Sequence, residues 1–419
     1  MTADIAVVGG GPAGLAAARA AALRGLSTLI LERNDYAARK LCITGKGRCN
    51  VTNTAGRDET MQSVATNARF LYSALSRFGC DEIRRLLDGA GVPTKVERGG
   101  RVFPESDRAS DVASAFERLA LEAGARVVTG ARVQSVCTEE GAVRSLRLYG
   151  GETVRCRSVV LCTGGASYPA TGSTGDGYRI ASELGHTIAP LRPALVPIIL
   201  SDAFVGGLEG LSLKNVRLSL LCGRKTVFSE LGEALFTRTG ISGPLALSAS
   251  SHMKDDARAY AIELDMKPGL DGGKLDARLL RDFAAYSNKR FKNALNDLLP
   301  GRLIPVFVGL AGIDPEKPVH QVDANERAGL AGLFKRWALH PETLGPIEEA
   351  IVTSGGVCVR EVDPKTMASK LVRGLYFAGE VLDVDALTGG YNLTIAFATG
   401  HAAGSHCLNY EPEETEGSA

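Results

Sequence analysis

The chain has 419 residues, enough for two domains of ordinary size, and its 45% hydrophobic and 23% charged content is typical of a soluble globular protein. Its formal net charge of +1 excludes the strong overall field that draws some proteins to nucleic acid or membranes. The most apolar stretch, residues 11–31, is interrupted by Arg19 and Arg24, so we expect no membrane span.

The nine cysteines are widely spread, and none forms a Cys-x-x-Cys pair. This excludes a zinc knuckle and a thioredoxin-type pair, and we find no other metal-ligand spacing and no serine–histidine–acid signature. Such cysteines are typical of free thiols in a reducing cytosol. The N-terminus lacks a secretory signal pattern. We therefore expect a cytoplasmic protein without a bound metal.

The N-terminal residues predict a strand–helix–strand unit. Residues 4–9 form an apolar run that predicts a short buried parallel strand. An alanine-rich helix follows from about Pro12 to Leu23, Gly25 ends it, and residues 27–31 predict a second strand. This unit is the building block of a parallel sheet.

Further strands are predicted at intervals along the chain. Residues 126–133 and 142–149 predict strands of a smaller antiparallel layer, and residues 158–163 predict another buried strand. Near the end, residues 374–378 predict a short strand that leads through glycines into a helix starting near Asn392. The two ends of the chain therefore predict one α/β domain made of two distant pieces.

The middle third differs in composition. Prolines cluster at positions 190, 193 and 197, alternating segments such as 216–221 predict antiparallel strands, and residues 275–300 predict a helix. We therefore expect three parts: a first piece of the α/β domain at residues 1–190, an inserted substrate domain at 191–355 with a helical part at about 270–325, and a last piece at 356–419.

The most informative motif is the run Gly-Gly-Gly-Pro-Ala-Gly from Gly9 to Gly14. A G-x-G-x-x-G pattern alone is weak, but here it stands between a predicted strand and a predicted helix, as a dinucleotide-binding turn requires. Gly9 permits the turn, Gly11 lets the backbone approach a pyrophosphate, and Gly14 lets helix and strand pack closely. Pro12 suits a helix start, which attracts the anion. Glu32, after the second strand, is placed to accept hydrogen bonds from a ribose.

The glycine turn does not separate FAD from NAD, but three other segments favour FAD. Residues 374–380 form a strand and a glycine turn, which in two-piece FAD domains returns to the ribityl chain or pyrophosphate. Residues 389–392 open a helix whose free N–H groups suit the pyrimidine of a flavin. The loop 39–53 is rich in glycine and donors, and Lys46, Arg48 and its amides are candidates for cradling an anion.

These segments resemble the BaiN/RdsA-type NAD(P)/FAD-dependent oxidoreductases, also known as the aminoacetone-oxidase family of FAD-binding flavoproteins. The matching stretches span nearly the whole chain and are the glycine turn and residues 44–53, 164–177, 235–244, 353–357, 366–370 and 374–392. The resemblance implies a glutathione-reductase-like Rossmann FAD domain with an inserted β-barrel-like domain carrying a small helical part.

The resemblance also implies the chemistry. One possibility is hydride transfer from reduced flavin to a C=C bond conjugated to a carbonyl, in a steroid-like enone or in uridine of ribosomal RNA. The alternatives are an oxidase that takes hydride from a small amine and produces peroxide, and a non-catalytic flavin-binding redox module. A reductase needs an acid near the flavin and donors on the carbonyl oxygen.

Three residues are candidates for this chemistry. Cys49 follows Arg48, a cation that would lower the pKa of the thiol. Tyr168 is a candidate proton donor, and Asn392 a candidate for holding a carbonyl. The structural alternatives are a buried apolar thiol for Cys49 and packing under the glycine loop for Tyr168.

The residues expected to bind the cofactor lie in these motifs or near them. They are Gly9, Gly11, Pro12, Ala13, Gly14, Glu32, Arg33, Lys40, Thr44, Gly45, Gly47, Arg48, Cys49, Asn50, Val133, Thr163, Gly164, Gly165, Gly379, Glu380, Asp383, Gly389, Gly390, Tyr391 and Asn392. We find no second strand–G-x-G-x-x-G–helix unit, so we expect NADH or NADPH as a transient reductant that visits the flavin in the substrate cleft.

An RNA substrate would require a basic surface leading to the flavin. The candidates form two groups: Arg281, Lys289, Arg290, Lys292 and Arg302, and Lys214, Arg217, Arg224 and Lys225. A solvated helix face is the alternative explanation of the first group. The sequence therefore leaves the substrate open between a small molecule and RNA.

Overall fold

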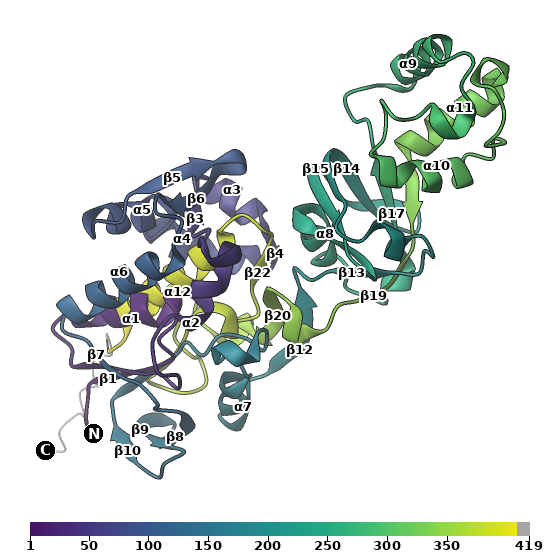
Figure 1. Ribbon diagram of the computed structural model, residues 1–419. Coiled ribbons are helices and arrows are strands. Elements are labelled where there is room, and N and C mark those ends of the chain that lie inside the picture. The colour runs from purple at the N-terminus through teal and green to yellow at the C-terminus, as the bar shows by residue number, and fades with distance from the viewer. Residues whose placement is uncertain (409–419) are drawn as a thin grey trace, which may run out of the picture. The chain divides into compact units, whose positions relative to one another are not determined.

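The computed structural model describes residues 1–408 and divides into two compact units. The first unit comprises Met1–Ala194 together with the chain from Ile347 onward, and the second comprises Leu195–Pro346. Figure 1 labels the elements of both units along the chain. None of the helices in residues 1–408 combines the length and the apolar character that crossing a bilayer requires.

The first unit is built on a parallel sheet of five strands. Their order is β21 (Leu375–Phe377), β11 (Ser158–Leu161), β1 (Ile5–Val8), β2 (Thr28–Leu31) and β7 (Arg126–Val128). Every neighbouring pair is parallel, and β1, β2 and β11 are buried throughout. This confirms the predicted α/β fold, since strands buried on both faces are continuous apolar runs.

One strand assignment was wrong. Residues 126–128 form β7, which joins the parallel sheet next to β2 instead of an antiparallel layer. The antiparallel layer consists of β8 (Val133–Glu139), β9 (Ala142–Leu148) and β10 (Thr153–Arg155). Strand β7 follows the helix α6 (Ala109–Glu122), so the helix is the crossover that a parallel neighbour requires.

Helix α1 (Pro12–Ala22) packs against α6 and against the C-terminal helix α12 (Tyr391–His406), as Figure 1 shows. The approach of α1 and α12 is very close. A Cβ atom added to Gly400 would lie 2.1 Å from the carbonyl oxygen of Ala13, and one added to Gly404 would lie 2.1 Å from that of Ala17. The C-terminal helix thus locks onto the N-terminal one through backbone contact.

Smaller elements complete the first unit. Strands β3 (Thr52–Asn53), β6 (Arg101–Pro104) and β5 (Thr94–Glu97) form one small sheet, and β12 (Ile188–Ala194) pairs with β20 (Val352–Val357) where the chain leaves and re-enters the unit. Strand β4 (Val64–Thr66) pairs with β22 (Asp385–Ala386). The remaining helices are α2 (Arg39–Ile43), α3 (Arg57–Gln62), α4 (Tyr72–Arg77), α5 (Cys80–Gly89) and α7 (Asp176–Glu183).

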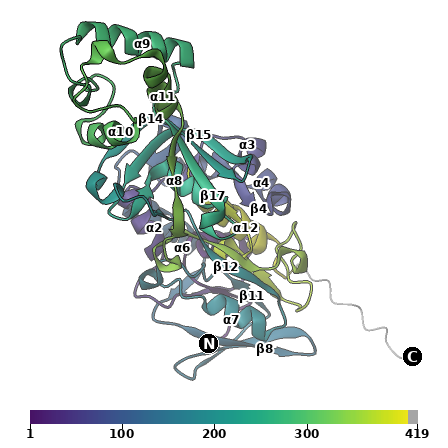
Figure 2. The same cartoon turned by 90° about the vertical axis from the view of Figure 1, so that its right-hand side faces the viewer.

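The second unit contains an antiparallel sheet of seven strands with helices. The strand order is β18 (Trp337–Leu339), β17 (Tyr260–Asp265), β14 (Ser212–Cys222), β15 (Lys225–Phe236), β16 (Gly240–Ser242), β13 (Ile198–Leu200) and β19 (Pro341–Leu344). Helix α8 (Gly243–Ser250) packs on β15. Helices α9 (Gly272–Ala285), α10 (Ile304–Leu310) and α11 (Ala324–Lys335) lie beyond one end of this sheet in Figure 1 and in Figure 2.

The predicted strand at 216–221 lies within β14 and is confirmed, but the predicted helix at 275–300 is too long. Helix α9 ends at Ala285, and the following residues form turns and short 3-10 segments. Ser287 and Asn288 stand at this point, and such side chains compete with helical hydrogen bonds through their own polar atoms.

The contact between α1 and α12 generates a prediction. Gly400→Ala and Gly404→Ala should each lower the free energy of unfolding by about 1–3 kcal/mol, because the added methyl groups force two helix backbones apart. This loss outweighs the gain of about 1 kcal/mol that alanine brings to a helix interior. Chemical denaturation of the FAD-loaded protein measures both.

The control is Gly329→Ala in α11, where an added Cβ has no atom within 4 Å. It should be neutral or stabilise by up to about 1 kcal/mol. Equal effects of all three substitutions would show that the α1–α12 contact does not require glycine.

Candidate functional site

The predicted cofactor residues gather at one edge of the parallel sheet. In the order β21, β11, β1 and β2 each strand is parallel to the next one. All four strands therefore end at the same edge of the sheet. The glycine turn follows β1 and Glu32 follows β2. The segment 162–165 follows β11, and Gly379 comes shortly after β21. This carboxyl edge is where open α/β sheets bind ligands.

The glycine turn has the predicted local geometry. Gly9 has a φ of +102°, which favours glycine, and a Cβ on Gly14 would lie 1.9 Å from the Gly9 carbonyl oxygen. These two roles, the turn and the close packing, are confirmed. An added Cβ on Gly11 would meet no atom within 4 Å, so this backbone is open to a ligand. Its contact with a pyrophosphate stays a prediction.

Glu32 is oriented by the glycine turn itself. The N–H of Gly10 donates to Oε2 of Glu32 over 2.8 Å, and the N–H of Asn34 donates to Oε1 over 2.8 Å. The residue is only 6% exposed. Next to it, the guanidinium of Arg33 donates to Thr174 and forms an ion pair with Asp176 at 3.2 Å. Glu32 is thus fixed at the end of β2, whereas the Arg33 side chain is held by the loop before α7.

A buried polar cluster joins the two pieces of the unit at this edge. Nζ of Lys40 lies 2.7 Å from Oε2 of Glu380 and donates to Oγ of Ser167 over 2.7 Å. The Thr353 N–H and the Ser167 hydroxyl donate to Oε1 of Glu380 over 2.9 and 3.1 Å. A Cβ on Gly165 would lie 2.6 Å from the same oxygen. The carboxylate therefore holds α2, the β11 loop and β20 together.

Strand β3, at the end of the segment 39–53, lies next to the start of α12. Asn53 donates from Nδ2 to the carbonyl oxygen of Gly389 over 2.9 Å, and a Cβ on Gly390 would lie 2.3 Å from the Thr52 carbonyl oxygen. The two segments that the sequence analysis selected for a flavin are thus brought together. Asn53, Ser167 and Thr353 lie in the stretches that carry the family resemblance but were not among the predicted cofactor residues, because the groups to which they hydrogen-bond are distant in the sequence.

The Arg48 side chain, which we expected to cradle an anion, is engaged by two carboxylates. Its guanidinium is paired with Glu97 and with Asp107, at 2.9 Å from Nε to Oδ1, and lies 4.3 Å from the centre of the Phe103 ring. Arginine paired with two carboxylates has no free donor face for a phosphate. Lys46 is exposed, with a φ of +60°. Lys46 and the backbone of the loop therefore stay the predicted anion contacts.

Cys49 also differs from its expected state. It is fully buried, and burial raises the pKa of its thiol to about 12. The expected lowering by Arg48 does not occur, because Arg48 is neutralised by its two carboxylates and the thiolate would be desolvated. Burial thus supports the structural alternative for Cys49.

Tyr168 and Asn392 occupy different environments. Tyr168 is half-buried in the loop after β11, with a φ of +51°, and its hydroxyl has no hydrogen-bond partner among residues 1–408. The amide of Asn392 closes a turn on Ala386, accepting from its N–H over 2.9 Å and donating to its carbonyl oxygen over 2.7 Å. The Asn392 amide is therefore already engaged, whereas the Tyr168 hydroxyl is available.

The remaining candidates lie at the periphery or in the strands. Val133 begins β8 and is buried, and Asp383 accepts from Nδ2 of Asn67 over 3.0 Å. The hydroxyl oxygen of Thr163, directly beyond β11, is buried and has no hydrogen-bond partner in the described chain. The partners of the His186 imidazole could not be read from the sequence. Its Nε2 lies 2.8 Å from Oγ of Ser369, and its Nδ1 lies 3.1 Å from Oε2 of Glu361.

The residues of this edge fit FAD. Helices α1 and α12 both begin at glycines, and within residues 1–408 neither start is capped by a side chain, so their first N–H groups remain available to an anion or a flavin carbonyl. The backbone at Gly11 is open, and the unpaired Thr163 hydroxyl suits a ligand rich in hydroxyl and phosphate groups. Glu32 is the acid placed for a ribose.

A Rossmann sheet with these two helix starts at its carboxyl edge defines the class of FAD-dependent oxidoreductases. The chain belongs to the HI0933-like family, whose Rossmann-domain model matches residues 3–406. It is 30% identical over 405 residues to a 3-dehydro-bile acid delta(4,6)-reductase of Clostridium scindens, covering 96% of this chain and 98% of that protein. It is 30% identical over 400 residues to a ribosomal RNA dihydrouridine synthase of Escherichia coli, covering 95% and 96%.

Solved structures support the fold. A 3-ketosteroid delta1-dehydrogenase from Sterolibacterium denitrificans superposes with a TM-score of 0.52 at 16% identity, over 97% of this chain and 99% of that one. A quinol-fumarate reductase also has a TM-score of 0.52, at 18% identity, over 97% of this chain and 71% of that one. At these identities the likeness concerns the fold.

The cluster around Glu380 generates a prediction. Lys40→Met should lower the free energy of unfolding by about 1–3 kcal/mol, because it leaves a largely buried carboxylate without its cation. The double variant Lys40→Met/Glu380→Gln should lose less than the sum of the two single variants, because the two side chains interact directly. Denaturation measures the stability, and titration with FAD measures the affinity, which should fall in the single variants.

The control pair is Arg118 and Glu122 on α6, whose side chains are 51% and 61% exposed. Removing this pair should change stability by less than about 1 kcal/mol and leave FAD affinity unchanged. Strictly additive losses at Lys40 and Glu380 would contradict the proposed coupling.

Proposed function

We propose that this chain catalyses the FAD-dependent reduction of a C=C bond conjugated to a carbonyl. The observation that carries the proposal is that the chain is similar along almost its whole length to two reductive enzymes with different substrates. One is a delta(4,6)-reductase of a bile acid, and the other forms dihydrouridine in ribosomal RNA. Both reactions saturate a double bond conjugated to a carbonyl.

When bound, FAD supplies the hydride from N5 of its reduced ring to the β-carbon of the substrate. The chain must then protonate the α-carbon and stabilise charge on the carbonyl oxygen. We assign the proton to Tyr168, since its hydroxyl is half-buried and has no partner in the described chain. Cys49 suits this role less, because a fully buried thiol with a pKa of about 12 releases its proton poorly.

In this proposal Asn392 has a structural role at the site. Its amide holds the turn before α12, so it positions Gly390 and the first N–H groups of the helix. These N–H groups supply the positive end of the helix dipole. In this proposal charge on the flavin is stabilised by backbone groups, and the Asn392 side chain keeps them in place.

We propose NADH or NADPH as the electron donor. Within residues 1–408 one strand–glycine turn–helix unit is present, at β1 and α1, and FAD occupies it in this proposal. A nicotinamide must therefore reach the flavin from the substrate side and leave again before the acceptor binds.

The near-zero net charge of the chain, together with the partly engaged basic residues, favours a small molecule over RNA. Nζ of Lys289 lies over the Tyr286 ring, and Arg290 and Lys292 both pair with Glu316. Arg302 donates to two backbone carbonyl oxygens, and Arg217 stands opposite Asp265 in the sheet. Arg290 and Lys292 share a single carboxylate, so the positive charge of this group is reduced but not cancelled. The net charge of +1 adds no overall attraction for RNA. We therefore take a steroid-like enone as the first candidate substrate.

The reaction is tested by reducing the FAD-loaded protein anaerobically with NADH or NADPH and mixing it with one acceptor at a time. A 3-oxo-Δ4 steroid should reoxidise the flavin faster than oxygen or a uridine-containing RNA fragment does, since hydride transfer requires the conjugated bond. Stopped-flow absorbance measures the three rates.

Each other outcome has a distinct meaning. Fast reoxidation by oxygen with peroxide formation would replace the reductase by an oxidase, and faster reoxidation by RNA would reverse the choice of substrate. If no acceptor reoxidises the chemically reduced flavin, the protein is a non-catalytic flavin module. If an acceptor reoxidises the chemically reduced flavin but neither NADH nor NADPH reduces it, the proposed electron donor alone is wrong.

The role of Tyr168 is tested by Tyr168→Phe. The rate of flavin reoxidation by the steroid should fall by about 100-fold, because a general acid contributes on this order, whereas flavin reduction by the nicotinamide should not change. Tyr149→Phe is the matched control, since Tyr149 is 49% exposed and outside the site. Equal rates in the two variants would remove Tyr168 from the proton transfer.

A further inference from the structure

A second concave site lies at the opposite edge of the parallel sheet. A cavity of about 650 Å³ is lined by residues at the amino ends of four strands: Asp4 before β1, Ser27 before β2, Ser158 at the start of β11 and Gly374 before β21. The cofactor residues described above follow the carboxyl ends of the same strands. Four residues at about 3.3 Å each separate the two edges by about 13 Å.

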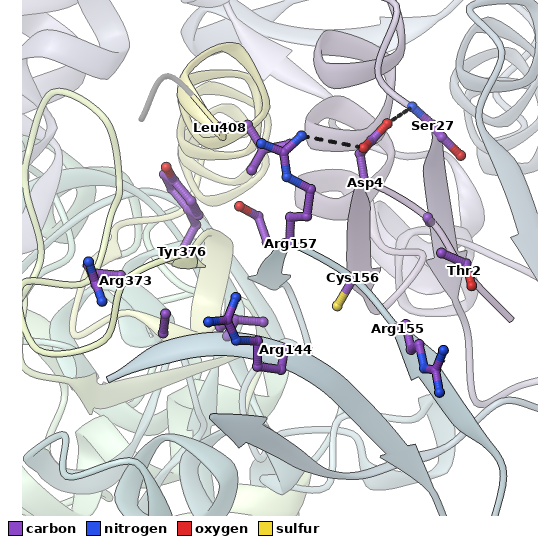
Figure 3. A pocket seen from close by; sticks show the side chains of 15 residues that line it. Thr2, Asp4, Ser27, Arg144, Arg155, Cys156, Arg157, Arg373, Tyr376 and Leu408 are labelled. Atoms are coloured by element: carbon purple, nitrogen blue, oxygen red, sulfur yellow. Dashed lines mark hydrogen bonds and ion pairs between the residues drawn. The ribbon is translucent and has the colours of Figure 1, made fainter. Parts of the chain in front are cut away.

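Arginine dominates the wall of this cavity. Arg144, Arg155, Arg157 and Arg373 line it, and Asp4 is the one carboxylate among the lining residues. Figure 3 shows these side chains around the cavity, with Arg157 directed toward Asp4. Arg144 lies in β9, Arg155 ends β10, Arg157 lies in the connection to β11, and Arg373 precedes β21. Distant parts of the chain therefore bring an excess of three positive charges to one cavity.

Most of this charge is not neutralised by strong ion pairs. Arg155 forms no ion pair with a described residue, and Arg157 lies 3.8 Å from Asp4 with its side chain 70% exposed. Arg144 lies 3.3 Å from Glu139, with the two side chains 57% and 72% exposed. Exposed pairs of this kind are weak and exchange readily with water or a ligand. By contrast, the Arg48 guanidinium is held by two carboxylates.

An independent observation comes from Ser158, which lines the same cavity. The residue is 1% exposed, and its hydroxyl oxygen has no hydrogen-bond partner within residues 1–408. A buried hydroxyl without a partner is unfavourable by about 1–3 kcal/mol and is rare in folded proteins. A hydroxyl of this kind in a cavity lined by four arginines is suited to an anion that accepts hydrogen bonds.

We propose that this cavity binds the phosphate group of a small phosphorylated molecule. The planar guanidinium group matches the oxygens of a phosphate, and the cavity volume is in the range of small-ligand sites. The ligand is not the hydride donor, because the width of the sheet separates it from the flavin edge. The cavity is therefore a second binding site, distinct from the site of the proposed reaction.

The test uses ribose 5-phosphate with the FAD-loaded full chain, and ribose as the matched compound without phosphate. Calorimetry should show saturable binding of ribose 5-phosphate alone, weakening as salt is raised. Arg155→Gln and Arg157→Gln should each weaken it by about tenfold, the loss expected for one charge-assisted hydrogen bond. Absence of saturable binding, or equal binding by both arginine variants and the parent, would overturn the proposal.

Two variants separate a ligand site from a structural role. Arg85→Gln removes an exposed arginine on α5, outside the cavity, and should leave the affinity unchanged. Ser158→Ala removes the unpaired hydroxyl, so it should keep or raise the melting temperature while weakening ribose 5-phosphate binding. If Ser158→Ala leaves binding unchanged, the hydroxyl does not face the ligand and this part of the argument fails. The flavin spectrum should be the same in all variants.

Two further experiments test whether RNA or the C-terminal carboxylates occupy this cavity instead. An oligoribonucleotide without terminal phosphates that displaces ribose 5-phosphate and binds more tightly would assign the cavity to RNA. The sequence beyond Leu408 contains Glu411, Glu413, Glu414 and Glu416. Changing all four to glutamine should leave the affinity unchanged, and a many-fold gain would assign the cavity to these carboxylates instead. Either result would overturn the proposal.

Discussion

The architecture depends on the close approach of backbone to backbone around α1. At one face, Gly14 lies so near the carbonyl oxygen of Gly9 that a side chain cannot fit, and at the other, Gly400 and Gly404 bring α12 against the carbonyl oxygens of α1. Small residues at a helix contact let dispersion act over a long, dense interface. This fixes the N-terminus of α1 at the carboxyl edge of β1, where the cofactor turn must be.

The same contact explains how a domain made of two distant pieces is held together. Helix α12 begins 369 residues after the end of α1, yet its start is beside the loop 44–53. Closing so large a loop is unfavourable in entropy, although the cost grows only slowly with its length. The α1–α12 contact and the Lys40–Glu380 ion pair offset this cost at two separate points. The cofactor edge is therefore assembled only when the C-terminal piece has docked.

The sequence allowed the parallel sheet and the glycine turn to be predicted, because both depend on local patterns: buried apolar runs and glycines at fixed spacing. Strand β7 was misplaced, since three residues after a helix carry no signal for the direction of pairing. The state of Cys49 and Arg48 could not be predicted either, because Glu97 and Asp107 lie 49 and 59 residues away from Arg48. Contacts over such separations appear only in the folded chain.

Three residues in the loops before β3 and after β11 adopt the left-handed backbone conformation. Lys46 and Cys49 both adopt a φ of +60°, and Tyr168, in the loop after β11, adopts +51°. Each such residue costs of order 1 kcal/mol and persists only where surrounding contacts impose it. For Cys49 these contacts are full burial and a hydrogen bond from its N–H to the Thr44 carbonyl oxygen. Its thiol is thus a buried packing group of the loop, whereas the Tyr168 hydroxyl has no hydrogen-bond partner in the described chain.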